Sequence, residues 1–381
     1  MREATRIFER SVAETGAFLD LLQRFVALES PSHESKAASD LCGRFYGELL
    51  SSLGCAVRTV SRANCGDQVA AEYGEGDGGI LLLGHYDTVF PLGTLKEMPW
   101  KVEDGKAYGP GVLDMKGGLL QAWFALKVLR DLGLAPARKI GFFINSDEES
   151  GSRSSREDIR AAALKSDIVL VPEPGLKELG DVKTSRSGRA VYRITAHGRS
   201  AHSGNAPQDG VSAATELALQ IPELGTLNDF PNGTTVSVTW MQAGVEDTAM
   251  IPGKGSMVLD VRAVAEEAME RVTGAIEGLR PRLEGIRLEI EGGVEKPPYE
   301  FNARNRALFE RAEALAAELN MSLKPNHVGG GSDANFTSPA GIPTLDGLGM
   351  TGAHLHSPGE YITIEHIPHR IALLALLLRR L

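Results

Sequence analysis

The stretch that decides the fold is residues 80–88, ILLLGHYDT, in which four apolar residues are followed abruptly by polar ones. A short apolar run bounded by glycine is typical of a strand buried on both faces of a sheet. Residues 140–144 and 167–171 form two more such runs, and a helix is predicted near 118–132. Strands that alternate with helices of this length predict an α/β sheet, mostly parallel and covered by helices on both faces.

The pattern changes near residue 183. Alternating strands and amphipathic helices then follow in the order β-α-β-β-α-β, which is the ferredoxin-like arrangement. After Pro297 and Pro298 the α/β pattern resumes. We therefore predict a discontinuous catalytic domain, 1–182 and 298–381, into which a smaller α+β domain, 183–297, is inserted. Towards the N-terminus, apolar residues at helical spacing predict helices over 11–28 and 35–53.

Composition restricts the class of protein. The 381 residues carry 40 Lys and Arg against 50 Asp and Glu, a net charge of −10, which argues against a nucleic-acid partner. Three cysteines form neither a disulfide framework nor a CxxC pair. The longest apolar run, 371–378, is much shorter than the ~18 residues that a membrane span needs. The charged N-terminal stretch is not followed by an apolar segment, so we expect no signal peptide. We expect a soluble, cytoplasmic protein without a membrane partner.

Polar clusters follow the predicted strands. His85 and Asp87 point to the same side of an extended chain, and a metal-bound histidine usually has a carboxylate behind it. A surface turn is the alternative. Asp114 lies between glycines before the helix at 118–132, where it could bind a ligand or cap the helix.

Further acidic and histidine residues follow later strands. Glu148 and Glu149 come after the run 140–144, and Glu173 follows 167–171. A solvated acidic loop is the alternative for the glutamates. With His85 and the later His356, these carboxylates make a plausible site for two zinc ions that share one carboxylate. Paired metals can deprotonate a water molecule and polarise a carbonyl group.

Six motifs in order carry a resemblance to a known family. The chain resembles the two-zinc metallopeptidases that include glutamate carboxypeptidase, acetylornithine deacetylase, succinyl-diaminopimelate desuccinylase and aminoacylase. It is most similar to the bacterial, folate-cleaving glutamate carboxypeptidase branch. The similarity covers nearly the whole length and is strongest over GHYDTVFPLGTL, YGPGVLDMKGG, NSDEESGS, AHSG, GGGSDA and HSPGEYI.

The resemblance implies a role for each matched residue. Glu148 would be the general base, taking a proton from the bridging water and passing it to the leaving amine. Asp87 would orient one histidine ligand, and the Asp114–Met115 peptide would be cis. The two zinc ions of each subunit, for which Co²⁺ or Mn²⁺ could substitute, would be held by His85, Asp114, Glu149, Glu173 and His356, with Asp114 bridging.

The inserted domain resembles the dimerisation lid of the family. His202 would reach the active site of the partner subunit in a homodimer and stabilise the oxyanion of the tetrahedral intermediate. Arg262 would hold the terminal carboxylate of the substrate in a pocket lined by Gly330 and Gly331. Without the family context, His202 would be an ordinary loop histidine and Arg262 an exposed strand charge.

Two positions depart from the family pattern. Ala249 replaces an Asn that usually contacts the substrate, and His327 replaces an Arg found in the glutamate carboxypeptidase used for comparison. An imidazole is a poor substitute for a forked, permanent cation, which weakens the case for strict glutamate specificity. Arg199 could supply the missing charge.

The sequence therefore predicts hydrolysis of an amide or peptide bond that releases a C-terminal, acidic amino acid. Expected substrates are small peptides, folate-like molecules or N-acyl amino acids. An N-acyl-amino-acid deacylase is the alternative enzyme. A non-catalytic binding protein on the same fold is a further alternative, which the presence of all seven expected metal-site residues disfavours.

Overall fold

The computed structural model describes residues 2–246 and 249–381, and the chain divides into two compact units. Unit 1 comprises Met1–Thr184, Phe301–His327 and Ser332–Leu381, and unit 2 comprises Ser185–Glu300 and Val328–Gly331. The short segment Val328–Gly331 belongs to unit 2, whereas we expected it in the catalytic domain. One reason is a backbone hydrogen bond of 3.0 Å from the Ser187 N–H to the Val328 carbonyl.

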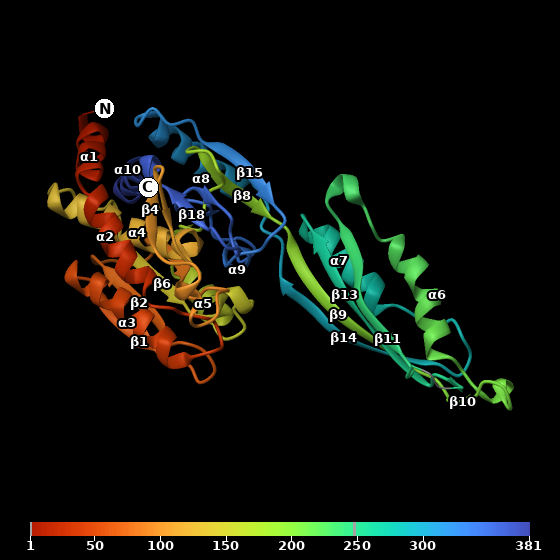
Figure 1. Cartoon of the computed structure of the whole chain (residues 1–381). Helices are drawn as coiled ribbons and strands as arrows, with labels where there is room; N and C mark the ends of the chain where they lie inside the picture. The colour runs from red at the N-terminus through yellow and green to blue at the C-terminus, as the bar shows by residue number, and fades with distance from the viewer. Residues whose placement is uncertain (1, 247–248) are drawn as a thin grey trace. The chain divides into compact units, whose positions relative to one another are not determined.

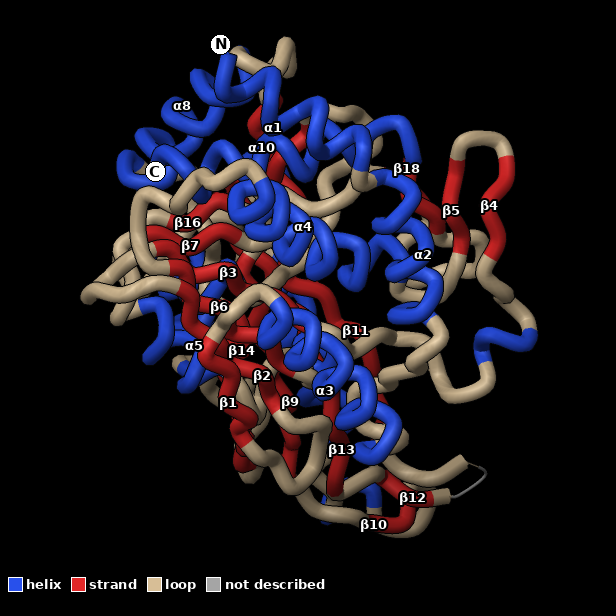
Figure 2. Tube along the Cα trace, turned by 90° about the vertical axis from the view of Figure 1, so that its left-hand side faces the viewer, coloured by secondary structure: helices blue, strands red, loops and turns tan. Residues whose placement is uncertain are grey.

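A six-stranded sheet forms the centre of unit 1, in the order β1-β2-β6-β3-β7-β16 (Figure 2). Strands β6, β3, β7 and β16 run parallel, and β2 and β1 continue the sheet antiparallel. All six residues of β3 are buried, as its apolar run predicts. The strands are β1 (Ala56–Val60), β2 (Gln68–Tyr73), β3 (Ile80–His85), β6 (Ile140–Asn145), β7 (Ile168–Leu170) and β16 (Thr344–Leu345).

Helices cover both faces of this sheet. One face carries the main core, in which Leu82 and Phe142 pack with residues of α1 to α4 and α10, and α5 lies on the other face. The helices are α1 (Arg2–Ala13), α2 (Thr15–Val26), α3 (Lys36–Ser52), α4 (Gly117–Asp131), α5 (Arg156–Ala163), α8 (Ala303–Ala317), α9 (Ala334–Thr337) and α10 (Ile367–Arg380).

The helix predicted over 11–28 is in fact two helices. The chain breaks at Glu14, because α1 packs mainly on α10 while α2 packs on α4. Sequence periodicity within one segment does not reveal such a change of partner.

A second, four-stranded sheet brings distant segments of unit 1 together. Its order is β17-β18-β5-β4, with β4 (Lys101–Glu103), β5 (Lys106–Tyr108), β17 (Gly352–Ala353) and β18 (Tyr361–Thr363). Tyr361 pairs with Tyr108, so the loop that precedes α4 lies beside the loop between β17 and β18. These loops carry Asp114 and His356.

Unit 2 contains a four-stranded antiparallel sheet in the order β11-β13-β9-β14, with two helices packed on it (Figure 1). With the chain order β-α-β-β-α-β, this is a ferredoxin-like arrangement with its own core. The elements are β9 (Gly188–His197), α6 (Ala213–Gly225), β11 (Thr235–Ala243), β13 (Lys254–Ala263), α7 (Glu266–Glu277) and β14 (Arg287–Lys296), with a short pair β10 (Ala201–His202) and β12 (Met250–Ile251). The remaining strands, β8 (Asp181–Arg186) and β15 (Lys324–Val328), pair as a ribbon.

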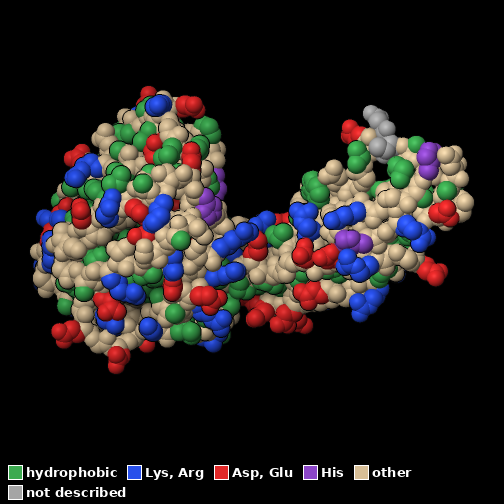
Figure 3. All heavy atoms as spheres, turned by 90° about the horizontal axis from the view of Figure 1, so that it is seen from below, with side chains coloured by type: hydrophobic (Ala, Val, Ile, Leu, Met, Phe, Trp, Pro, Cys, Tyr) green, Lys and Arg blue, Asp and Glu red, His purple; other side chains and the backbone are tan. Residues whose placement is uncertain are grey.

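On the face drawn in Figure 3, acidic and basic side chains are interspersed. Among the described residues, no helix combines the length and apolar character needed to cross a membrane.

Candidate metal centre

The predicted ligands of unit 1 converge at one edge of the central sheet. His85 is the last residue of β3, Glu149 lies in the short 3-10 turn after β6, and Glu173 follows β7. Because the carboxyl ends of parallel strands meet at the same edge, the fold places these side chains together. Asp114 comes from the irregular turn before α4, and His356 from the loop between β17 and β18.

The carboxylate of Asp114 lies between the two histidines. Its Oδ1 is 3.2 Å from Nε2 of His85, and its Oδ2 is 3.1 Å from Nε2 of His356. Glu173 Oε1 lies 3.3 Å from the first of these nitrogens, and Glu149 Oε1 lies 3.3 Å from the second. Asp114 is thus shared between two histidines, each of which also contacts a glutamate.

Three of these ligand atoms are buried without a hydrogen bond from any described residue. They are Nε2 of His85, Oδ1 of Asp114 and Oε1 of Glu149. Ligand atoms of the same three residues all lie within 4.8 Å of one another. Leaving buried polar atoms unpaired is costly, and a cation would pair all three. Imidazole and carboxylate donors suit zinc, and they also suit manganese or cobalt.

The electrostatics also call for positive charge. Burial lowers the pKa of His85, but Asp114, Asp87 and Glu173 outweigh this effect and hold it well above its usual range. The neighbouring carboxylates of Asp114 and Glu149 raise the pKa of His356 to about 11. Burial and the charge of Asp114 raise the pKa of Glu149 to about 8. All three shifts favour the protonated, more positive form of the group concerned.

Asp87 supports the centre from behind. Nδ1 of His85 lies 3.0 Å from the Asp87 backbone carbonyl, so Nδ1 carries a proton and, when the ring is neutral, Nε2 presents its lone pair to the site. The fully buried carboxylate of Asp87 accepts the backbone N–H groups of Glu148 and Glu149, at 3.2 and 3.1 Å, and the hydroxyl of Ser32 at 2.6 Å. Asp87 thus orients a histidine through its backbone carbonyl and holds the turn that carries both glutamates through its side chain.

Glu148 precedes Glu149 in the chain and is also largely buried. Its side chain is 7% exposed, and it begins the turn that Asp87 holds. The peptide between Asp114 and Met115 is cis, as the resemblance implies.

Sequence reasoning did not predict the role of two residues that hold these loops. Asp333 accepts hydrogen bonds from Asn145 and Ser152, which flank the turn of Glu148 and Glu149. Glu360 accepts the backbone N–H of Asp114. Asp333 and Glu360 lie inside the GGGSDA and HSPGEYI motifs, so the motifs were signals for them, although their partners were not visible.

The predicted residues of unit 2 are a separate group. His202 is exposed on β10, and its Nδ1 accepts the N–H groups of Gly204 and Asn205, both at 3.1 Å. The other ring nitrogen, Nε2, therefore carries the hydrogen and can donate it. The carbonyl of Ala249 accepts the N–H of Ser203 at 2.9 Å.

Arg262 is partly engaged within unit 2. Its Nε donates to Asp260 at 2.7 Å and its Nη1 donates to the Gly329 carbonyl at 3.3 Å. A guanidinium has five N–H donors, so others remain for a ligand. Arg186, which we did not predict, is buried and donates to the carbonyls of Gly330 and Gly331, both at 3.1 Å.

The two remaining predicted residues, Arg199 and His327, belong to different units. Arg199 donates to the Asp209 carbonyl at an exposed position. His327 lies on β15 and is counted with unit 1, and burial lowers its pKa.

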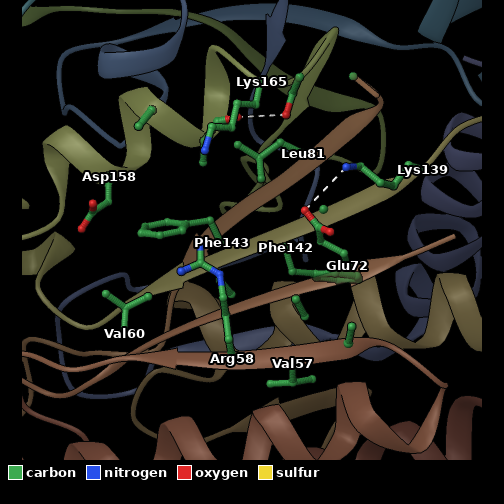
Figure 4. A pocket seen from close by; sticks show the side chains of 18 residues that line it. Val57, Arg58, Val60, Glu72, Leu81, Lys139, Phe142, Phe143, Asp158 and Lys165 are labelled. Atoms are coloured by element: carbon green, nitrogen blue, oxygen red, sulfur yellow. Dashed lines mark hydrogen bonds and ion pairs between the residues drawn. The ribbon is translucent and has the colours of Figure 1, made fainter. Parts of the chain in front are cut away.

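A hollow of about 470 Å³ lies on the other face of the central sheet (Figure 4). Arg58, Leu81 and Phe143 line it from the strands, and Lys165 lines it from beyond α5. None of the predicted site residues lines it, so this hollow is distinct from the metal centre.

Comparison with known proteins adds a family context. Residues 81–380 match the profile of Peptidase family M20/M25/M40. The chain is 30% identical over 382 aligned positions to carboxypeptidase G2 of Pseudomonas sp. (strain RS-16), covering 98% of this chain and 91% of that one. It is 29% identical to succinyl-diaminopimelate desuccinylase of Halorhodospira halophila, covering 75% and 78%. Its fold is similar to that of aminopeptidase PepT from Bacillus cereus, with a TM-score of 0.79 at 20% identity, covering 96% and 98%.

Proposed function

Because the chain belongs to peptidase family M20/M25/M40, an enzyme family, we propose that it is a zinc-dependent hydrolase of amide or peptide bonds that releases a C-terminal, acidic amino acid. The observation that carries the proposal is the Asp114 carboxylate. It directs one oxygen to each of two histidines, and buried ligand atoms beside it have no hydrogen-bond partner among the described residues.

We assign the predicted ligands to two ions. His85 and Glu173 would hold one, His356 and Glu149 the other, and Asp114 both. When bound, such ions polarise the scissile carbonyl and lower the pKa of a water molecule.

Glu148 is our proposed general base. It would take a proton from the attacking water and deliver it to the nitrogen of the leaving amine. Its position at the start of the turn held by Asp87 supports this role, because the backbone N–H groups of Glu148 and Glu149 both donate to the buried Asp87 carboxylate. His202 would donate its Nε2 hydrogen to the carbonyl oxygen as that atom gains negative charge.

Recognition of the substrate is proposed to depend on Arg262. Its uncommitted N–H groups would bind the terminal carboxylate, beside Gly330 and Gly331. Small peptides, folate-like molecules and N-acyl amino acids are the candidate substrates, and similarity to carboxypeptidase G2 supports the first. The preference for a terminal Glu has to be tested, because the sequence departs from the family pattern at Ala249 and His327 and Arg199 is only a candidate replacement for the missing charge. Similarity to a desuccinylase favours N-acyl-amino-acid deacylation as the second candidate.

We also propose a homodimer formed through unit 2. Strand β11 is an edge strand of its sheet, and exposed apolar side chains lie on or near it, among them Trp240 (44% exposed) and Met250 (47%). Long apolar edges are normally covered in solution. We propose a cytoplasmic location from the sequence. The three cysteines are buried and free, as is usual for proteins in a reducing compartment.

The test is Glu148→Gln, with Glu157→Gln as a matched control at an exposed position on α5. Zinc-loaded proteins are assayed against peptides and folate-like substrates ending in Glu or Asp, and against N-acetyl amino acids. We expect Glu148→Gln to lower kcat by about 10²–10⁴-fold with zinc still bound. Near-normal turnover by this variant would rule out the mechanism, and exclusive cleavage of N-acetyl amino acids would select the deacylase.

A further inference from the structure

Glu360 is a buried acid with no role in the proposed chemistry. It immediately precedes β18, and none of its surface is exposed to solvent. A carboxylate is rarely buried to this extent unless it is paired or hydrogen-bonded. Its contacts therefore indicate what it does.

The side chain of Glu360 reaches across to the loop that carries Asp114. Its Oε1 accepts the backbone N–H of Leu113 at 2.8 Å and that of Asp114 at 3.1 Å. Its own backbone carbonyl accepts the N–H of Gly109 at 3.3 Å. One residue thus binds both the beginning and the end of the loop that leads into the metal centre.

Asp114 needs such an external anchor. Its backbone, at φ −116° and ψ 101°, is not helical, and neither is that of Met115, so the helical turn is interrupted at this point. A helix therefore does not fix the direction of its side chain. The hydrogen bond from its N–H to Glu360 does so, and this direction places one carboxylate oxygen near His85 and the other near His356.

The same acid is tied to the second histidine. The Glu360 N–H donates to the Ser357 carbonyl at 3.3 Å, and the Ser357 N–H donates to the His354 carbonyl at 3.2 Å. His356 lies inside this turn, with a left-handed backbone at φ +58°. The position of Asp114 is thereby linked to the position of His356 through a short, hydrogen-bonded stretch of chain.

We propose that Glu360 is a positioning residue that sets the bridging geometry of Asp114 through hydrogen-bond acceptance, and that its charge is not what matters. The inference rests on the proposed function, because it assumes metal at this centre. Oε1 makes both contacts, and Oε2 has no hydrogen-bond partner among the described residues. A glutamine keeps an acceptor oxygen in place of Oε1, and its amide nitrogen replaces Oε2 without the loss of a hydrogen bond.

Two substitutions separate geometry from charge. Glu360→Gln keeps the length and the acceptor but removes the charge. Glu360→Asp keeps the charge but draws the oxygens back by about 1.5 Å, the length of one C–C bond, which is too far for both N–H groups. Each metal-free protein is titrated with Zn²⁺ by calorimetry, and Co²⁺ absorption spectra report the ligand geometry.

We expect Glu360→Gln to bind zinc within about 3-fold of the wild type, and Glu360→Asp to bind about 10–100-fold more weakly, the usual range for a residue that supports a ligand. The Co²⁺ spectrum should change only in Glu360→Asp. Glu365→Asp is the control, because the Glu365 side chain lies five residues further along the chain and is 81% exposed. This variant should bind zinc as the wild type does.

The opposite order, with Glu360→Asp binding tightly and Glu360→Gln weakly, would show that charge dominates and would overturn the inference. Equal binding by all variants would overturn it as well. If the wild-type protein itself bound no metal, the proposed function would fall first. Circular dichroism of the metal-free variants checks folding, and loss of fold in Glu360→Gln would count against hydrogen-bond acceptance as the only role.

Discussion

Arg370, on α10, is a buried cation whose removal should destabilise unit 1. None of its surface is exposed, and it donates hydrogen bonds to four backbone carbonyls, those of Leu179, Asp181, Gly347 and Gly349. The Gly349 N–H in turn donates to the Glu173 carbonyl at 2.8 Å. The arginine therefore joins α10 to loops beside the metal centre.

Two opposing effects decide the size of the change in Arg370→Met. Burial lowers the pKa of Arg370 to about 10, which corresponds to a cost of about 3 kcal/mol that methionine would relieve. Against this, each buried carbonyl left without a donor costs about 1–3 kcal/mol, so the four together cost at least about 4 kcal/mol. The second effect is larger. We expect the free energy of unfolding to fall by at least about 1 kcal/mol.

The assay is urea unfolding of the metal-free protein, followed by circular dichroism and by tryptophan fluorescence, with Trp123 as a buried reporter in unit 1. Arg379→Met is the control, because Arg379 lies on the same helix but is partly exposed and donates to one carbonyl, that of Ala135. It should change stability by less than about 1 kcal/mol. If Arg370→Met were as stable as the wild type, or more stable, the cost of burying the cation would exceed the value of its hydrogen bonds, and the reasoning would be refuted.

Three further predictions concern other parts of the chain. Burial raises the pKa of Cys55 to about 11, so about one thiol in a thousand is ionised at pH 8. Ellman's reagent should therefore react slowly with the native protein and rapidly in urea. A fast reaction of the native protein would contradict the burial. Burial alone would raise the pKa of Asp260, but Arg262 and Arg189 hold it below its usual value, so its stabilising contribution is present above about pH 4 and is lost as the pH falls. Asp260→Asn should therefore reduce the difference in urea midpoint between pH 6 and pH 3, and an unchanged difference would show that other acids account for it. His202→Ala should lower kcat while the metal content, measured by mass spectrometry, stays the same. The reason is that the His202 ring is hydrogen-bonded only within its own loop in the described structure. Loss of metal would contradict this placement.

Local sequence was sufficient for the elements that are buried on both faces. The strands β3 and β6 follow directly from their apolar runs, because a strand covered by helices on both sides needs apolar residues throughout. The edge strand β1 was missed, since most of its residues are exposed and it lacks such a run. The break at Glu14 was missed because it depends on which helices α1 and α2 contact.

The sequence by itself determined which side chains could form a metal centre, because ligand chemistry is a property of residue type, and six ordered motifs placed those types after successive strands. The tertiary structure decided how they meet. The hydrogen bond that orients Asp114 comes from Glu360, 246 residues along the chain, and the one that holds Asn145 comes from Asp333, 188 residues away. Neither pairing leaves a local pattern, because a buried hydrogen bond depends on the position of its partner in space and not on the separation of the two residues in sequence.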